Sequence, residues 1–216
     1  MKMKKVVLLG DSIRMGYDKY VKEALAGVAE VYYPDTNCAF SVHLLRYTHE
    51  WKAKGEWGDD VDLVHWNAGL WDMLELFGDE PLSTKDYYAH NVLKIHNRLR
   101  MLFPKAKLVF ATSTTVWEER CSKDFRRHNA TIDAYNKAAL AVLSDTDSLY
   151  NDLYTHSLNC PEEYRSDAVH FYTDGGTEYF GKKVVSVICN ELGIGGNEVN
   201  LENFKPENYS KDIIGY

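Results

Sequence analysis

Short apolar runs rich in β-branched residues alternate with longer segments of helical periodicity along almost the whole chain, and this alternation limits the fold more than any other feature. Strands are expected at 6–9, 29–33, 61–66 and 107–111, with a weaker candidate at 148–153. Capping residues, glycine or proline bound the helical segments, which are expected at 17–26, 41–54, 84–103, 126–143 and 174–192.

This alternation predicts an α/β sandwich with a mostly parallel sheet, because strands that alternate with helices pair in the same direction. Right-handed crossover connections then place helices on both faces of the sheet. Ligands of such sheets bind beyond the carboxyl ends of the strands. Residues with chemistry are therefore expected directly after positions 9, 33, 66, 111 and 153.

The length of 216 residues fits one large domain with a sizeable core. We assign residues 1–194 to this domain, because the last helical pattern ends at Gly193. The remaining segment, 195–216, is polar and begins with two glycines. It is expected to be an irregular extension that packs on the domain or on a partner subunit, so a homo-oligomer is compatible with the sequence.

The chain has 25 basic and 32 acidic residues and a formal net charge of −7. Such a charge gives no general attraction for nucleic acid or an anionic membrane, and no apolar stretch approaches the ~20 residues of a membrane helix. The four cysteines form no C-x-x-C pair, and the histidines lack metal-ligand spacing, so neither a metal nor a cofactor is expected. Scattered cysteines and the short apolar run at 6–9 favour a cytoplasmic location.

Gly10-Asp11-Ser12 follows the first predicted strand, where the chain turns into a helix. In this position the Ser12 hydroxyl points out at the carboxyl edge of the sheet, and the Ser12 N–H lies at a helix N-terminus that favours negative charge. The alternative is that Asp11 or Ser12 only caps the helix. The tripeptide alone does not decide between a nucleophile and a cap.

Asp167 and His170 lie three residues apart in the loop before the last predicted helix. In a tight loop the carboxylate can bind one imidazole nitrogen and leave the other free to accept a proton. Together with Ser12 they form a set of nucleophile, base and orienting group. Their order along the chain is that of the α/β-hydrolases, but the second glycine of the G-x-S-x-G turn is missing.

Two further segments follow predicted strands. Asn67 comes directly after 61–66, and its side-chain amide could donate to a developing oxyanion; it could equally form a turn before Gly69. The run 37–42 follows the second strand and opens a predicted helix, whose first N–H groups are also candidate oxyanion donors.

In combination, the four segments resemble the SGNH/GDSL hydrolase family of esterases and acylhydrolases, in the family's motif order and over residues 4–193. The first block is Gly10-Asp11-Ser12 and the last contains Asp167 and His170. The resemblance implies a flavodoxin-like three-layer α/β/α sandwich with a five-stranded, mainly parallel sheet.

The two middle blocks depart from the family pattern. Val42 stands where the family has a glycine that serves through its backbone N–H, which a valine also provides. The family's Gly-x-Asn-Asp block reads His-Trp-Asn-Ala here, so that only Asn67 matches. Asp72 lies further along and does not fill the missing position directly.

The resemblance implies ester hydrolysis without a metal, through an acyl-enzyme. His170 would take the Ser12 proton and Asp167 would hold the imidazole tautomer. The oxyanion hole would consist of the Ser12 N–H, the Val42 N–H and the Asn67 amide, and one such donor is typically worth ~2.7–4 kcal/mol of barrier. We expect a serine esterase that acts on a small acyl group, such as acetyl, on a carbohydrate or another alcohol.

Three further residues are candidates for substrate binding. Arg14 follows the Ser12 turn and could bind a carboxylate or phosphate, or else pair with a neighbouring acid. Trp71 and Trp117 follow two of the strands and could stack on a sugar ring or line an acyl pocket, or else pack in the core. Trp66 is assigned to the core, and His65 is the remaining histidine expected nearest the site.

Three other functions stay open. A lysophospholipase or thioesterase would act on longer acyl chains through the same three residues and would need an apolar trough beside Ser12. A non-catalytic binding module could retain the fold, although it would not need Ser12, Asp167 and His170 together. A flavodoxin-like or nucleotide-binding domain ranks last, because no G-x-G-x-x-G or P-loop follows the first strand.

Overall fold

Five parallel strands form one sheet in the order β2-β1-β3-β5-β7 in the computed structural model, which describes residues 2–203. The strands are β1 (Lys4–Leu9), β2 (Ala29–Tyr32), β3 (Leu63–Trp66), β5 (Lys107–Ala111) and β7 (Leu149–Asn151). All four residues of β3 and the last four of β1 are buried, as expected for strands covered on both faces. These continuous apolar runs are the pattern that predicted the sheet.

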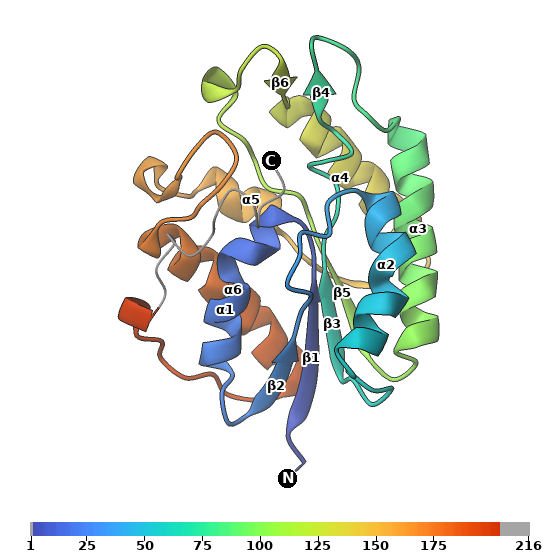
Figure 1. Ribbon diagram of the computed structural model, residues 1–216, viewed down its shortest axis with the longest axis vertical. Helices are drawn as coiled ribbons and strands as arrows, with labels where there is room; N and C mark the ends of the chain where they lie inside the picture. Colours follow the sequence, from blue (N-terminus) through green and yellow to red (C-terminus); the bar gives the residue numbers. More distant parts are fainter. Residues whose placement is uncertain (1, 204–216) are drawn as a thin grey trace.

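Helices cover both faces of the sheet, and the fold is the predicted three-layer α/β/α sandwich with a flavodoxin-like strand order (Figure 1). One face carries α1 and α6, which pack against each other, and the other carries α2, α3 and α4. The helices are α1 (Ser12–Ala24), α2 (Ser41–Lys54), α3 (Lys85–Leu102), α4 (Asn129–Leu143), α5 (Leu153–Leu158) and α6 (Asp174–Leu192).

The strand order reverses at β1, which pairs with β2 on one side and with β3 on the other. Ligands of open α/β sheets bind at such a switch point, beyond the carboxyl ends of the strands. The register places Leu9 beside Trp66, so the residues that follow both strands are neighbours. The topology therefore brings the segments after β1 and β3 to one place.

The predicted helix at 126–143 begins late, and its expected start was wrong. Phe125–Arg126 is the short strand β6, which pairs antiparallel with β4 (Glu75–Leu76), and the helix begins at Asn129. The Asn129 N–H donates to Glu118 Oε1 at 2.7 Å, which satisfies one donor of the first helical turn. A tertiary strand pairing overrides the helical pattern here.

At two other boundaries a cap sets the limit. The first helix begins at Ser12, as the turn after 6–9 indicated, and so starts before the apolar periodicity from 17; Asp11 caps it by accepting the Ile13 N–H at 3.0 Å. The last strand ends at Asn151 rather than at 153, because Asp152 caps α5 by accepting the Thr155 N–H at 2.9 Å.

The beginning of the predicted extension contacts the end of α1. The Asn197 N–H donates to the Ala24 carbonyl at 2.7 Å, and its side-chain amide donates to the Ala26 carbonyl at 2.8 Å. A short 3-10 helix, Leu201–Asn203, follows, and the rest of the predicted extension lies outside the described residues. Within 2–203, no helix is both long and apolar enough to cross a lipid bilayer.

Candidate active site

Hydrogen bonds join the carboxyl end of β1 to the segments that follow β3 and β2. The Asn67 N–H donates to the Leu9 carbonyl at 3.0 Å, and the Cys38 N–H donates to the Gly10 carbonyl at 3.1 Å. A Cβ at Gly10 would lie 1.9 Å from the Asn67 side-chain oxygen. Glycine is therefore required at this position, so that the Asn67 side chain can lie against the turn that carries Ser12.

Ser12 is the first residue of α1, and its side chain does not cap the helix. Asp11 performs that role through the Ile13 N–H, so the Ser12 hydroxyl is left for another partner. Burial raises the pKa of Asp11, whose carboxyl is completely buried. Ser12 itself is only 4% exposed, so little of its surface reaches solvent.

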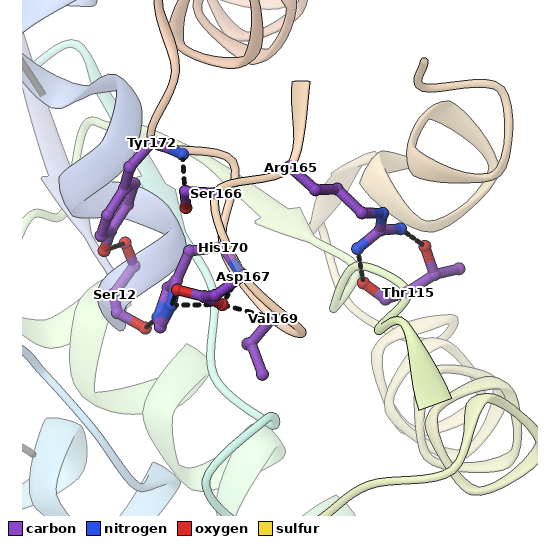
Figure 2. Close-up of polar contacts among 8 residues, drawn as sticks. All are labelled: Ser12, Thr115, Arg165, Ser166, Asp167, Val169, His170 and Tyr172. Carbon is purple, nitrogen blue, oxygen red and sulfur yellow. Dashed lines mark hydrogen bonds and ion pairs between the residues drawn. The ribbon is translucent and has the colours of Figure 1, made fainter. Parts of the chain in front are cut away.

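His170 binds Ser12 with one ring nitrogen and Asp167 with the other (Figure 2). The distance from His170 Nε2 to Ser12 Oγ is 2.8 Å, and the distance from His170 Nδ1 to Asp167 Oδ2 is also 2.8 Å. These three residues come from the start of α1 and from the loop before α6. The packing of α1 against α6 therefore brings Ser12 to the loop before α6 and completes a continuous hydrogen-bonded chain from hydroxyl to carboxylate.

The Asp167 carboxylate is held in its ionised form. Its Oδ1 accepts the backbone N–H groups of Val169 at 2.7 Å and of His170 at 2.8 Å. Burial acts to raise the pKa of Asp167, but the hydrogen bonds and charge of His170 outweigh it and lower this pKa to about 2. An ionised carboxylate only accepts, which puts the imidazole proton on Nδ1 and leaves Nε2 to accept the Ser12 hydroxyl.

Val42 is the second residue of α2, directly after a residue that Asp72 anchors. Asp72 is fully buried; its Oδ2 accepts the Ser41 N–H at 2.9 Å and its Oδ1 accepts the Ser41 hydroxyl at 2.6 Å. The first-turn position leaves the Val42 N–H without an acceptor inside the helix, and the residue as a whole is 41% exposed. Asp72 thus fixes the start of α2 against the loop after β3.

Arg14 has the structural role that the sequence left open as an alternative. Its guanidinium is buried and forms an ion pair with Asp18, one turn further along α1. It also donates to the Pro34 carbonyl at 3.1 Å and to the Thr36 carbonyl at 2.6 Å. These bonds attach α1 to the loop after β2, and substrate binding by Arg14 gains no support from them.

The two tryptophans assigned to substrate binding lie in loops at the carboxyl edge. Trp71 is partly exposed and packs against Phe40 just before α2, with ring centroids 5.4 Å apart. The backbone N–H of Trp117 donates to the Ala168 carbonyl at 2.7 Å, which places Trp117 beside the loop that contains Asp167 and His170. Arg120 covers one face of the Trp117 ring at 3.6 Å.

His65 and Trp66 lie in the core, at the end of β3. Trp66 is fully buried and packs against Phe110, as expected. His65 is also fully buried, where its Nε2 lies 3.1 Å from the Asn151 amide, and burial lowers its pKa to about 3. This environment keeps His65 neutral, and His65 is a core residue rather than a residue of the site.

The sequence did not identify two residues in the loop that contains Asp167 and His170. The Tyr172 hydroxyl donates to the Ser12 carbonyl, and its ring stacks on His170. Arg165 donates to the carbonyl of Thr115 at 3.2 Å and to its hydroxyl at 2.7 Å, which ties the loop before α6 to the loop after β5 (Figure 2). Neither residue belongs to a motif, so only the tertiary structure identifies them.

Within residues 2–203, no group of three or more histidine, cysteine, aspartate or glutamate side chains is arranged to hold a metal ion. The groups that the structure brings together at this edge are the hydroxyl of Ser12, the imidazole of His170 and the carboxylate of Asp167.

Neither a family profile nor a curated protein matches the sequence, but solved structures match over most of its length. A lipase/acylhydrolase from Enterococcus faecalis has a TM-score of 0.68 at 20% identity and covers 91% of this chain and 100% of its own. The acetyl xylan esterase AlAXEase has a TM-score of 0.66 at 17% identity, and the match covers 85% of this chain and 99% of the esterase. A carbohydrate esterase family 3 protein from Talaromyces cellulolyticus has a TM-score of 0.63 at 17% identity, and the match covers 89% of this chain and 100% of that protein.

These similarities show that the three-layer α/β/α sandwich is shared with solved esterases and acylhydrolases. More specifically, it is the SGNH/GDSL hydrolase fold, which confirms the resemblance drawn from the four sequence segments.

Proposed function

We propose that the protein is a serine ester hydrolase that works through an acyl-enzyme. The observation that carries the proposal is the hydrogen-bonded chain from Ser12 Oγ through His170 to Asp167, with both distances at 2.8 Å. A nucleophile, a base and an orienting carboxylate in this order are the groups that acyl transfer needs. The esterases and acylhydrolases among the structural neighbours support the same reaction class.

In the first step, His170 Nε2 takes the Ser12 proton while Ser12 Oγ attacks the ester carbonyl carbon. Asp167 stays ionised and stabilises the imidazolium that forms, because its pKa of about 2 lies far below neutrality. The tetrahedral intermediate then collapses, and His170 gives the proton to the departing alcohol oxygen. The acyl group remains on Ser12.

Negative charge develops on the former carbonyl oxygen during this attack. We assign its stabilisation to the Ser12 N–H at the start of α1, the Val42 N–H at the start of α2, and the Asn67 side-chain amide. Two of these donors are helix N-terminal groups, where the helix dipole also favours an anion. Asp72 keeps the second helix start in place through Ser41.

In the second step, water replaces the alcohol. His170 takes a proton from the water as its oxygen attacks the acyl carbonyl, and returns that proton to Ser12 Oγ when the acyl bond breaks. The products are a carboxylic acid and regenerated enzyme, so the cycle needs no cofactor.

For the substrate, we propose a small acyl group, such as acetyl, on a carbohydrate or another alcohol. Two observations support a small acyl group: Ser12 is only 4% exposed, and Val42 places a branched side chain at the start of α2. An acetyl xylan esterase and a carbohydrate esterase are among the structural neighbours. In this proposal Trp71 and Trp117 contact the alcohol part.

The direct test is hydrolysis of p-nitrophenyl acetate by the wild type and by Ser12→Ala, with fluorophosphonate labelling of both. Labelling at Ser12 and loss of hydrolysis in the variant are expected. Equal background rates in both proteins and no labelling would contradict the proposed esterase function and favour a binding module with the same fold.

Acyl esters of increasing chain length test the substrate. Acetyl esters are expected to give the highest kcat/KM, because longer chains need more room beside the largely buried Ser12. A preference for octanoyl esters would instead favour a lysophospholipase or thioesterase.

A further inference from the structure

Tyr172 contacts both the nucleophile and the base of the triad. It lies two residues after His170, in the short link to α6, and reaches back to the start of α1 (Figure 2). Its hydroxyl donates to the backbone carbonyl of Ser12, and its ring stacks on the His170 ring with centroids 4.7 Å apart and planes 24° apart. One side chain therefore spans the two segments that the Ser12–His170 hydrogen bond joins.

The hydroxyl contact restrains the peptide group of the nucleophile. The Ser12 carbonyl belongs to the first turn of α1, where in a regular helix it accepts the Gly16 N–H. The Tyr172 ring lies over the same turn, and a Cβ at Gly16 would come within 2.8 Å of Cε1 of that ring. Glycine at 16 thus lets the phenol reach Ser12, and the contact fixes the direction from which the Ser12 side chain leaves the helix.

The ring contact restrains the base on a different side from Asp167. Asp167 binds an edge of the imidazole through Nδ1, whereas Tyr172 covers a face of it. Together the two contacts hold the imidazole ring in the orientation in which Nε2 points at Ser12 Oγ. An aromatic face also attracts a cation, so the same stack favours the imidazolium that forms during attack.

The backbone of Tyr172 completes the connection. Its N–H donates to the Ser166 hydroxyl at 3.1 Å, and the Ser166 N–H donates to the His170 carbonyl at 3.0 Å. Ser166 directly precedes Asp167. These two hydrogen bonds hold together the loop that contains Asp167 and His170. Tyr172, which makes one of them, is also the residue whose side chain reaches Ser12.

We infer that Tyr172 is a positioning residue for the proposed ester hydrolysis, which holds Ser12 and His170 in register and stabilises the charged imidazole in the transition state. The inference rests on the proposed function. It assigns Tyr172 no contact with substrate, so its removal should lower kcat and leave KM nearly unchanged.

The chain offers a matched control in Tyr179. Its ring stacks on His156 with centroids 4.0 Å apart and planes 13° apart, and its hydroxyl donates to the His156 carbonyl at 3.1 Å. Tyr179 and Tyr172 are both partly buried. The two tyrosines make the same kinds of contact, but Tyr179 touches neither Ser12 nor His170 in these contacts.

The experiment compares Tyr172→Leu, Tyr172→Phe, Tyr179→Leu and Tyr179→Phe with the wild type. For each, kcat and KM for p-nitrophenyl acetate, the fluorophosphonate labelling rate and the thermal unfolding midpoint are measured. Tyr172→Leu is expected to lower kcat and the labelling rate by ~10–100-fold, with KM within about twofold. Tyr172→Phe keeps the stack on His170 but loses the hydrogen bond to Ser12, so it should recover part of this loss.

Both Tyr179 variants should keep wild-type kcat even where they lower the unfolding midpoint. Wild-type kcat in Tyr172→Leu would overturn the inference, and so would an equal fall in Tyr179→Leu or an effect confined to KM. Labelling of the wild type at Ser12 distinguishes a failure of the inference about Tyr172 from a failure of the proposed function. If the wild type and every variant label normally, the protein is still a serine hydrolase and only the role of Tyr172 is wrong. A wild type that neither labels nor hydrolyses would overturn both.

Discussion

The molecule contains a tyrosine–histidine stack at the candidate site, His170 with Tyr172, and another between α5 and α6, His156 with Tyr179. In both, the tyrosine hydroxyl also donates to a nearby backbone carbonyl. The histidines differ in what their ring nitrogens bind. His170 lies between a carboxylate and a hydroxyl, whereas His156 Nε2 lies 3.2 Å from the backbone carbonyl of Tyr179.

The difference shows that ring packing by itself does not make a histidine a base. The carbonyl can only accept, so His156 Nε2 carries a proton and donates it, and burial lowers the pKa of this histidine. His170 Nε2 instead accepts from Ser12, because the ionised Asp167 keeps the proton on Nδ1. The partners of the two ring nitrogens therefore decide which histidine can move a proton.

The largest expected effect tests this comparison directly. His170→Ala and Ser12→Ala should each lower kcat for p-nitrophenyl acetate by at least ~10³-fold, since the triad acts as a unit. His156→Ala should keep kcat within about twofold and lower the thermal unfolding midpoint, because it removes a partly buried stack. A comparable loss of kcat in His156→Ala would contradict the distinction between the two histidines.

Replacing the carboxylate should have the next largest effect. Asp167→Asn is expected to lower kcat by ~10²–10⁴-fold, because the amide can donate to Nδ1 and favour the wrong tautomer. The matched change is Asp152→Asn at the N-cap of α5, where asparagine caps as well as aspartate. This control should leave both kcat and stability unchanged. Wild-type kcat in Asp167→Asn would show that Asp167 does not set the tautomer.

A smaller loss is expected on the oxyanion side. Asn67→Ala should lower kcat by ~10²–10³-fold, the typical cost of one oxyanion donor, with KM little changed. Asn136 is a buried amide that instead holds the backbone of Ser113, with its oxygen 2.8 Å and its nitrogen 2.9 Å from their partners. Asn136→Ala should therefore cost stability rather than turnover. If Asn67→Ala retained full turnover, Asn67 would have no part in the mechanism.

The smallest effect on activity is expected at His65, whose role is confined to stability. Its pKa of about 3 in the folded protein lies below its ordinary 6.5, so between these values the unfolded chain binds a proton that the folded chain does not. The free energy of unfolding should fall with acid in this range by up to ~1.4 kcal/mol per pH unit from this group. Denaturant unfolding of His65→Leu should show a shallower pH dependence, and an unchanged slope would contradict this account.

The sequence predicted the parts of the site that depend on local rules. An apolar run, a turn with glycine and a helix start placed Ser12, and the sheet topology placed Asn67 beside it. Residues that act through distant contacts had no such signal. Tyr172 reaches Ser12 only because Gly16 leaves room for its ring, and Arg14 pairs inward only because the loop after β2 supplies carbonyl acceptors.

The same reasoning explains the errors in secondary structure. The strands β4 and β6 have two residues each and exist through their mutual pairing, so neither has a pattern of its own. The fold was predictable because four longer strands each carry enough apolar residues to be recognised alone, whereas short elements need their partners; β7, with three residues, gave only a weak signal.

The hydrogen bond between Ser12 and His170 joins residues 158 positions apart in the chain. Ribosomes add ~5–20 residues each second, so the hydroxyl waits on the order of ten seconds after its own synthesis before its base exists. During that interval the nascent chain carries a serine of ordinary reactivity. Esterase activity would therefore begin only when the last loop and α6 have docked against α1, and it would serve as a readout of completed folding.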